Sequence, residues 1–128
     1  MHVLDRFREA LPPGGVILDL QVVPPDPVVE SDGERVCEIE GRALLDRAAV
    51  AAAAVDDAVA RGLLVEEAVD DHVVRAHYPT GAALVEDFET KRRNVPDAAV
   101  PVLKALERPC VVVEPCRVRR LVVPRAAG

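Results

Sequence analysis

Apolar and polar positions along the chain alternate between helical and extended spacing. Apolar residues at helical spacing predict helices over 2–11, 42–61, 81–93 and 98–107. The helix over 42–61 is the clearest of these, because alanine, its commonest residue, is the strongest helix former. Continuous or alternating apolar runs predict strands over 16–23, 63–78, 111–113 and 116–123. A further hairpin is expected to join 28–30 to 35–40 through the turn at 31–34.

Helix breakers and capping residues mark the ends of these elements. Pro12 and Pro13 end the first helix, and the next two glycines supply a turn. Gly62 is a candidate C-terminal cap, and Thr80 is a candidate N-terminal cap. Two adjacent aspartates at 70–71 suggest that the extended stretch over 63–78 breaks into two pieces.

This order of elements predicts an α+β fold in a single domain covering 1–128. Strand, hairpin, long helix, strand, two helices and strand do not alternate regularly enough for a doubly wound parallel sheet. We expect a largely antiparallel sheet of about four to six strands, with the helices over 42–61 and 81–93 packed on it.

Composition and charge argue against a nucleic-acid partner. The chain has a formal net charge of −6, whereas phosphate neutralisation requires a basic face. Its aromatic residues are two Phe and one Tyr, with no Trp, which argues against stacking platforms for bases.

The cysteines and the apolar runs predict a cytoplasmic protein that does not enter a membrane. Three cysteines, with no recognisable signal peptide, favour reduced thiols, and their spacing does not suggest a metal site. The longest apolar stretch, Ala48–Val55, is far too short to span a bilayer.

The stretch FREALPPGGVILDL, residues 7–20, resembles a segment of class I S-adenosylmethionine-dependent methyltransferases. In that family a helix ending in a Leu-x-Pro-Gly-Gly turn leads into the fifth strand of a seven-stranded sheet. The matching residues are Leu11, Pro13, Gly14 and Gly15, followed by Val16, Ile17, Leu18 and Asp19. The segment HYPTGAALVEDF, residues 77–88, is similar to a strand-to-helix segment in the C-terminal part of some such proteins.

The same resemblance implies that this chain has no cofactor site of its own. The family binds its cofactor through a glycine-rich loop after the first strand and an acidic residue at the end of the second. Both elements lie upstream of the Pro-Gly-Gly turn, and the residues before Pro13 are too few to supply them. We therefore expect no bound cofactor and no binding of S-adenosylmethionine.

Four polar residues on predicted strands are the candidate ligand-binding residues. Asp19 and Gln21 lie on one face of the first strand, where a desolvated carboxylate can act as a base. His72 and Tyr78 share a face of the later strand and can line a wet pocket, whereas His77 points to the opposite face. The alternative in each case is a polar side chain at a solvated strand surface.

Two charged clusters are further candidates. The acidic cluster comprises Glu66, Glu67, Asp70 and Asp71, and it can hold Mg²⁺ or simply form a solvated face. The arginine set comprises Arg117, Arg119, Arg120 and Arg125. Arg117 and Arg119 alternate with Val118 as on a solvent-facing strand, where they can bind an anion or prevent edge pairing.

Two functions from different classes remain open at this point. The first is a non-catalytic, methyltransferase-derived domain that acts as a homodimer or through a partner chain, with the strand over 16–23 as the exposed edge. The second is a small-molecule binding protein or enzyme with a pocket near Asp19, His72 and Tyr78. The sequence identifies no catalytic residue.

Overall fold

The computed structural model describes residues 3–125, which form an α+β fold with an open antiparallel sheet. The helices are α1 (Val3–Ala10), α2 (Arg42–Ala60), α3 (Gly81–Thr90) and α4 (Ala99–Lys104). The strands are β1 (Val16–Val22), β2 (Val28–Ser31), β3 (Glu34–Glu38), β4 (Val65–Tyr78) and β5 (Cys110–Val122). The predicted fold class is confirmed, while His2, the predicted start of the first helix, lies outside the described residues.

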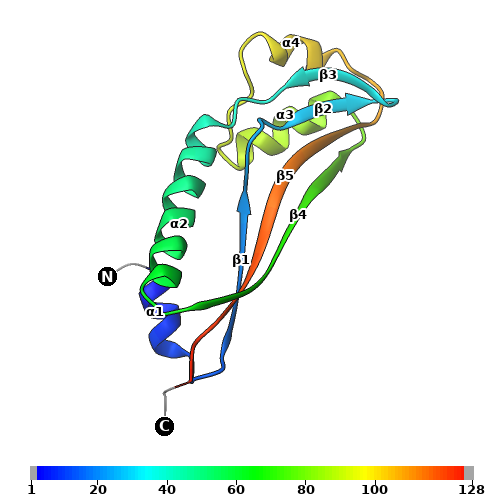
Figure 1. Ribbon diagram of the computed structural model, residues 1–128. Helices are drawn as coiled ribbons and strands as arrows, with labels where there is room; N and C mark the ends of the chain where they lie inside the picture. Colours follow the sequence, from blue (N-terminus) through cyan, green and yellow to red (C-terminus); the bar gives the residue numbers. More distant parts are fainter. Residues whose placement is uncertain (1–2, 126–128) are drawn as a thin grey trace. The chain divides into compact units, whose positions relative to one another are not determined.

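The long strand β5 pairs with three other strands of the sheet, β1, β2 and β4 (Figure 1). Its later part pairs with β1, from Cys116 opposite Val22 to Val122 opposite Val16. Its earlier part pairs with β2, with Val111 opposite Glu30 and Val113 opposite Val28. The strand order is β1-β5-β2-β3, and β4 also pairs with β5. β1 is therefore a terminal strand of the sheet.

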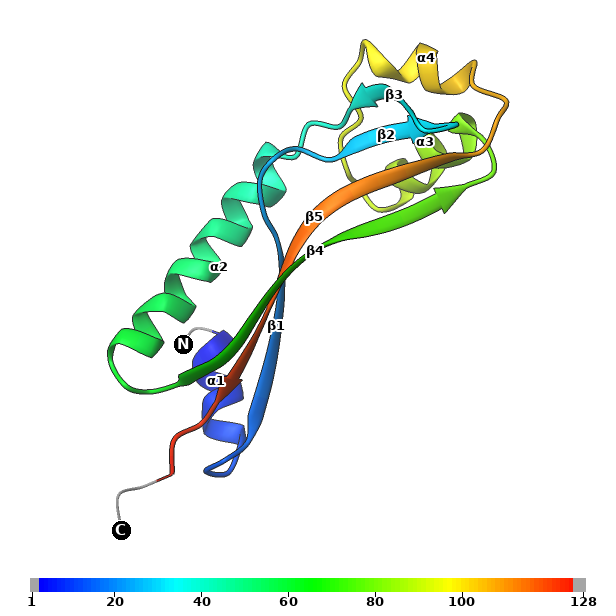
Figure 2. The ribbon, with the colours of Figure 1, turned by 45° about the vertical axis from the view of Figure 1, so that its right-hand side comes forward.

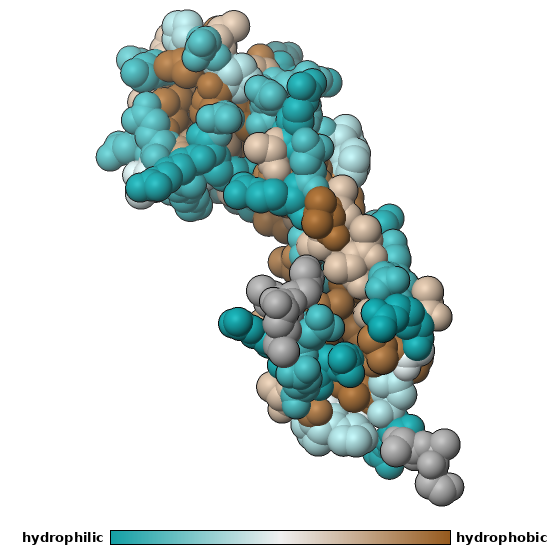
Figure 3. All heavy atoms as spheres, turned by 90° about the vertical axis from the view of Figure 1, so that its left-hand side faces the viewer, coloured by the Kyte–Doolittle hydropathy of each residue, from teal (hydrophilic) through white to brown (hydrophobic). Residues whose placement is uncertain are grey.

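The chain divides into two compact units, each with its own hydrophobic core. Unit 1 comprises the described residues up to Val23, Leu44–His72, and those from Cys116 onward. Its core joins Val55 and Ala58 of α2 to Leu64 and to Leu121 of β5. On the side of α2 seen in Figure 3, hydrophilic side chains are interspersed with hydrophobic ones.

Unit 2 comprises Pro24–Ala43 and Val73–Pro115. Its core packs α3 and α4 against the inner face of β2 and β5, and Figure 2 shows α3 beside this part of the sheet. The buried residues of α3 include Leu84, Val85 and Phe88, as the helical spacing predicted. Thr80 is the predicted N-cap, and its hydroxyl accepts a hydrogen bond of 3.1 Å from the backbone N–H of Ala83.

Three predicted boundaries need correction. The two aspartates at 70–71 do not break β4, which is continuous from Val65 to Tyr78 because their carboxylates lie exposed on the strand. The two predicted C-terminal strands are one, β5, which runs through Pro115. The third and fourth helices cover only Gly81–Thr90 and Ala99–Lys104, shorter than the predicted 81–93 and 98–107.

Candidate functional site: the β1 surface and the predicted polar residues

β1 presents an apolar face to solvent. Val16, Leu18 and Leu20 alternate along the strand and are 38%, 68% and 58% exposed. Only the opposite face is covered, where Ile17 packs against the core around Leu121. Side chains two apart on a strand share one face, so these three form a continuous apolar strip. We call Val16, Leu18 and Leu20 the β1 strip.

The outer edge of β1 is also unpaired among residues 3–125. Exposed edges are usually protected by charged side chains. β4 carries such protection in its acidic cluster, and β3 carries Glu34, Arg35 and Glu38, all exposed. β1 has only Asp19 as a charged residue, and Asp19 lies on the opposite parity from the β1 strip. β1 is therefore the least protected edge of the sheet.

Asp19 and Gln21 lie together, as their spacing predicted. The Gln21 side-chain amide donates a hydrogen bond of 3.1 Å to Oδ1 of Asp19. The other carboxylate oxygen, Oδ2, is buried and has no hydrogen-bond partner in the described part of the chain. Asp19 is paired in register with Arg119 of β5, but the guanidinium of Arg119 binds Glu66 and Asp56 instead.

His72 and Tyr78 each have a neighbour of their own. His72 Nδ1 lies 3.4 Å from Oδ2 of Asp70, close to the surface of unit 1. In unit 2, the Tyr78 hydroxyl donates a hydrogen bond of 2.5 Å to Oδ2 of Asp87 on α3. Asp19, Gln21 and His72 therefore belong to unit 1 and Tyr78 belongs to unit 2.

The environment of Tyr78 favours the protonated, neutral form of its phenol group. Burial, followed by the hydrogen bond to the Asp87 carboxylate, raises the pKa of Tyr78 to about 12. The same hydrogen bond, together with Lys91 at 2.9 Å, lowers the pKa of Asp87. The ring of Tyr78 also packs edge-on against Phe88, with ring centroids 6.4 Å apart. Tyr78 is therefore a neutral hydrogen-bond donor that joins β4 to α3.

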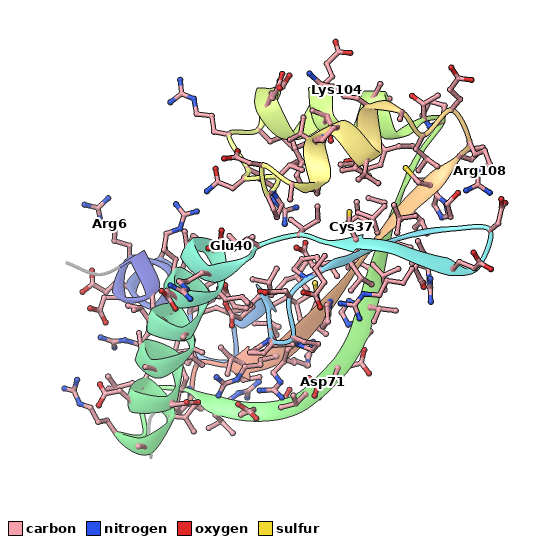
Figure 4. The ribbon with its side chains drawn as sticks, turned by 90° about the horizontal axis from the view of Figure 1, so that it is seen from above. Arg6, Cys37, Glu40, Asp71, Lys104 and Arg108 are labelled. Carbon is pink, nitrogen blue, oxygen red and sulfur yellow. The ribbon has the colours of Figure 1, made fainter. Side chains whose placement is uncertain are left out.

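The acidic cluster and the arginine set bind one another. Arg117 makes two hydrogen bonds to Asp71, and Arg120 makes one of 2.9 Å to Glu67. Arg119 bridges Glu66 and Asp56. Arg119 was predicted to face solvent, but its side chain is only 11% exposed, because β4 and α2 both supply carboxylates to it. Figure 4 labels Asp71 on β4, where the guanidinium of Arg117 lowers the pKa of the carboxyl group.

These ion pairs were missed from the sequence because they join residues about fifty positions apart. The only available signal was that one strand is acidic and the other basic, which favours cross-strand pairing. Arg125, the fourth member of the set, lies instead beside Gly14 in the Pro-Gly-Gly turn.

Unit 2 contains a hollow of about 360 Å³ that the sequence did not predict. Arg75 and His77 of β4 lie on one side of it, and Glu30 of β2 also lines it. The alternation along β4 did place His77 on the face opposite Tyr78, and Arg75, two residues before His77, shares the face of His77. The sequence could not show that Glu30 of β2 lies on the same side of the sheet as Arg75 and His77 and lines the hollow with them.

The described residues were compared with two simple requirements, a cluster of metal-ligating side chains and a membrane-spanning helix. Between residues 3 and 125, no three His, Cys, Asp or Glu side chains gather as a metal site requires. None of the helices described is both long and apolar enough to cross a membrane.

Comparisons with protein-family models, with curated proteins and with solved structures gave no match.

Proposed function

We propose that this chain is a methyltransferase-like domain that acts by association through β1, as a homodimer or with a partner chain, and that it performs no catalysis of its own. The local structure around the Pro-Gly-Gly turn supports this proposal. α1 ends at Ala10, Gly14 takes a φ of +85° that favours glycine, and β1 follows directly. The resemblance implies the same order of helix, turn and strand.

The observation that carries the proposal is the combination of an open edge and an exposed apolar strip on one strand. Burying apolar side chains favours association by roughly 25 cal/mol per Å² removed from water, from which the entropic cost of bringing two chains together is subtracted. The unpaired backbone N–H and C=O groups of β1 can add a hydrogen-bonded strand at the same place. A second copy of β1 can pair antiparallel with the first about a two-fold axis, which gives a closed dimer.

Sedimentation velocity of the purified chain tests this proposal. We expect the wild type to sediment as a dimer or larger species and the double variant Leu18→Glu, Leu20→Glu to sediment as a monomer, because charges in the strip oppose its burial. Val50→Glu is the matched control, since Val50 is 69% exposed on α2 and away from β1. A monomeric wild type at high concentration, with no partner recovered with it, would overturn the proposal.

The proposal assigns no cofactor residue to the chain. We predict that calorimetric titration with S-adenosylmethionine gives no binding heat, because the chain lacks the glycine-rich loop that a nucleoside cofactor requires for close backbone approach. Measurable saturable binding would instead favour a retained methyltransferase. Cys37 and Cys110 are free thiols in the structure, and we keep the prediction of a cytoplasmic location.

A further inference from the structure

The hollow in unit 2 lies on the sheet face opposite the core. Val29 and Val112 point into the core, so their neighbours Glu30 and Val111, which are paired in register, point to the other face. Both line the hollow, which is completed by the β2–β3 turn and the start of β5. The whole hollow belongs to unit 2 and is separate from the β1 strip of unit 1.

The side formed by β4 is basic and unpaired. Arg75 and His77 are two residues apart, so both side chains point to the same face. Both are exposed, and neither makes an ion pair or a hydrogen bond within residues 3–125. The other arginines on the described strands, Arg35, Arg117, Arg119 and Arg120, are bound to carboxylates, whereas the guanidinium of Arg75 is available to an anion.

The side formed by β2 is acidic. Glu30 is half-buried and makes no ion pair within the described part of the chain. Its cross-strand neighbour on β3, Arg35, binds Glu38 instead. Because β2 and β4 both pair with β5, two strand spacings of about 4.8 Å separate the acidic and basic sides. The hollow therefore keeps opposite charges apart across an apolar floor at Val111.

The residues around the mouth of the hollow bind one another and do not bind Arg75 or Glu30. Arg108 binds Asp32 at 2.7 Å at the tip of the hairpin, and Figure 4 labels Arg108 beside that turn. The buried hydroxyl of Ser31 donates a hydrogen bond of 2.8 Å to the carbonyl of Pro109. Burial raises the pKa of the Cys110 thiol, so this residue is a neutral part of the wall and not a nucleophile.

We propose that this hollow binds a small zwitterion, a free amino acid with an aliphatic side chain. Its carboxylate would bind Arg75, with His77 beside it, and its ammonium group would bind Glu30. The aliphatic side chain would lie on Val111 and Pro109. A volume of about 360 Å³ is at the small end of ligand pockets and suits a molecule of this size. This inference does not depend on association through β1.

Titration of the ¹⁵N-labelled chain with L-leucine, followed by amide chemical shifts, tests this inference. We expect saturable shifts confined to the neighbourhood of residues 30–33, 75–77 and 109–111. L-leucine methyl ester lacks the carboxylate and N-acetyl-L-leucine lacks the ammonium group, so each should bind at least tenfold more weakly. Absence of saturable shifts with L-leucine would overturn the proposal.

Two variants and a control assign the roles of the charged residues. Arg75→Gln should abolish the response to L-leucine, and Glu30→Gln should weaken it at least tenfold while leaving the response to N-acetyl-L-leucine unchanged. Arg47→Gln, a charge removal at an exposed position of α2, should leave both unchanged. Equal responses in wild type and Arg75→Gln would show that the ligand binds elsewhere.

Discussion

Tyr78 illustrates what the sequence can and cannot say about a single residue. Strand alternation placed Tyr78 and Ala76 on one face of β4, and the structure packs both against the core of unit 2. The sequence also suggested that this face is the wall of a wet pocket. Whether Tyr78 lines a pocket depends on which side chain its hydroxyl contacts, and strand alternation does not specify that partner. The partner is Asp87, nine residues further along the chain on α3.

The protonation of Tyr78 gives a direct prediction, because the chain contains one Tyr and no Trp. Phenolate absorbance of the folded protein should titrate with a midpoint near pH 12 instead of the ordinary value of 10.0. Since the pKa is raised on folding, the stabilising contribution is complete below pH 10.0 and is lost as the pH rises through about 12. Circular dichroism over the same range would establish that the chain is still folded.

The control for this titration is Asp87→Asn. Removal of the carboxylate removes the charged hydrogen-bond acceptor, but burial of the phenol remains and is the larger cause. The midpoint should therefore fall below that of the wild type and stay above 10.0. A wild-type midpoint already at the ordinary value would contradict the geometry of the Tyr78–Asp87 pair.

At the scale of elements, the contact between α3 and α4 depends on a glycine. A Cβ atom at Gly81 would lie 2.0 Å from the carbonyl oxygen of Leu103, which is backbone and cannot rotate away. We expect Gly81→Ala to lower the free energy of unfolding by about 3 kcal/mol, because α4 must shift. Urea denaturation followed by circular dichroism measures this loss.

Gly33→Ala is the matched control for that substitution. Gly33 has a φ of +76°, but no atom lies within 4 Å of the added Cβ. Only backbone strain opposes the substitution, so the expected loss is about 1 kcal/mol. Equal losses for the two variants would argue against the close α3–α4 contact.

The pairing of β5 with its neighbours predicts unequal effects for two adjacent arginines. Arg119 is 11% exposed and binds Glu66 and Asp56, so Arg119→Gln should cost about 1.5–3 kcal/mol of unfolding free energy. Arg120 is 49% exposed and binds only Glu67, so Arg120→Gln should cost less than about 1 kcal/mol. Thermal and urea unfolding of the two variants in parallel distinguish these outcomes, and equal losses would contradict the burial of Arg119.

The merging of two predicted C-terminal strands into β5 has a physical cause in cross-strand pairing. The apolar runs predicted one strand ending at Val113 and another beginning at Cys116, and Pro115 between them has no backbone N–H. In the structure it falls between the segment of β5 that pairs with β2, which ends at Val113, and the segment that pairs with β1, which begins at Cys116. Neither of these two ladders includes Pro115, so its missing N–H removes no hydrogen bond from them, and β5 continues through the proline.

At the scale of the whole molecule, the sequence predicted the fold class but not which strands would be neighbours. Local periodicity determines helix and strand types, and these were sufficient for an α+β fold with helices on a sheet. The pairing of β5 with β1, β2 and β4 depends on contacts between distant residues. For the same reason the sequence identified Asp19 with Gln21, which are local, and missed Glu30 with Arg75, which are not.

The net charge of the molecule gives a last prediction about association. The chain carries −6 at pH 7 and has an isoelectric point near 5.0, so repulsion between copies weakens as the pH falls between these values. If the β1 strip drives association, the weight-average mass at fixed concentration should rise over this range. Added salt at pH 7 should cause a similar rise, because it screens the same charges.

General association of the protein near its isoelectric point would also raise the weight-average mass. A variant that changes the β1 strip without changing the charge distinguishes this cause from association through the strip. Leu18→Ser, Leu20→Ser leaves the isoelectric point unchanged and removes most of the exposed apolar area of the strip. Sedimentation equilibrium should therefore find this variant monomeric at both pH values, whereas Val50→Ser should follow the wild type. A rise of equal size in all three proteins would assign the association to the general loss of charge and remove β1 from its explanation.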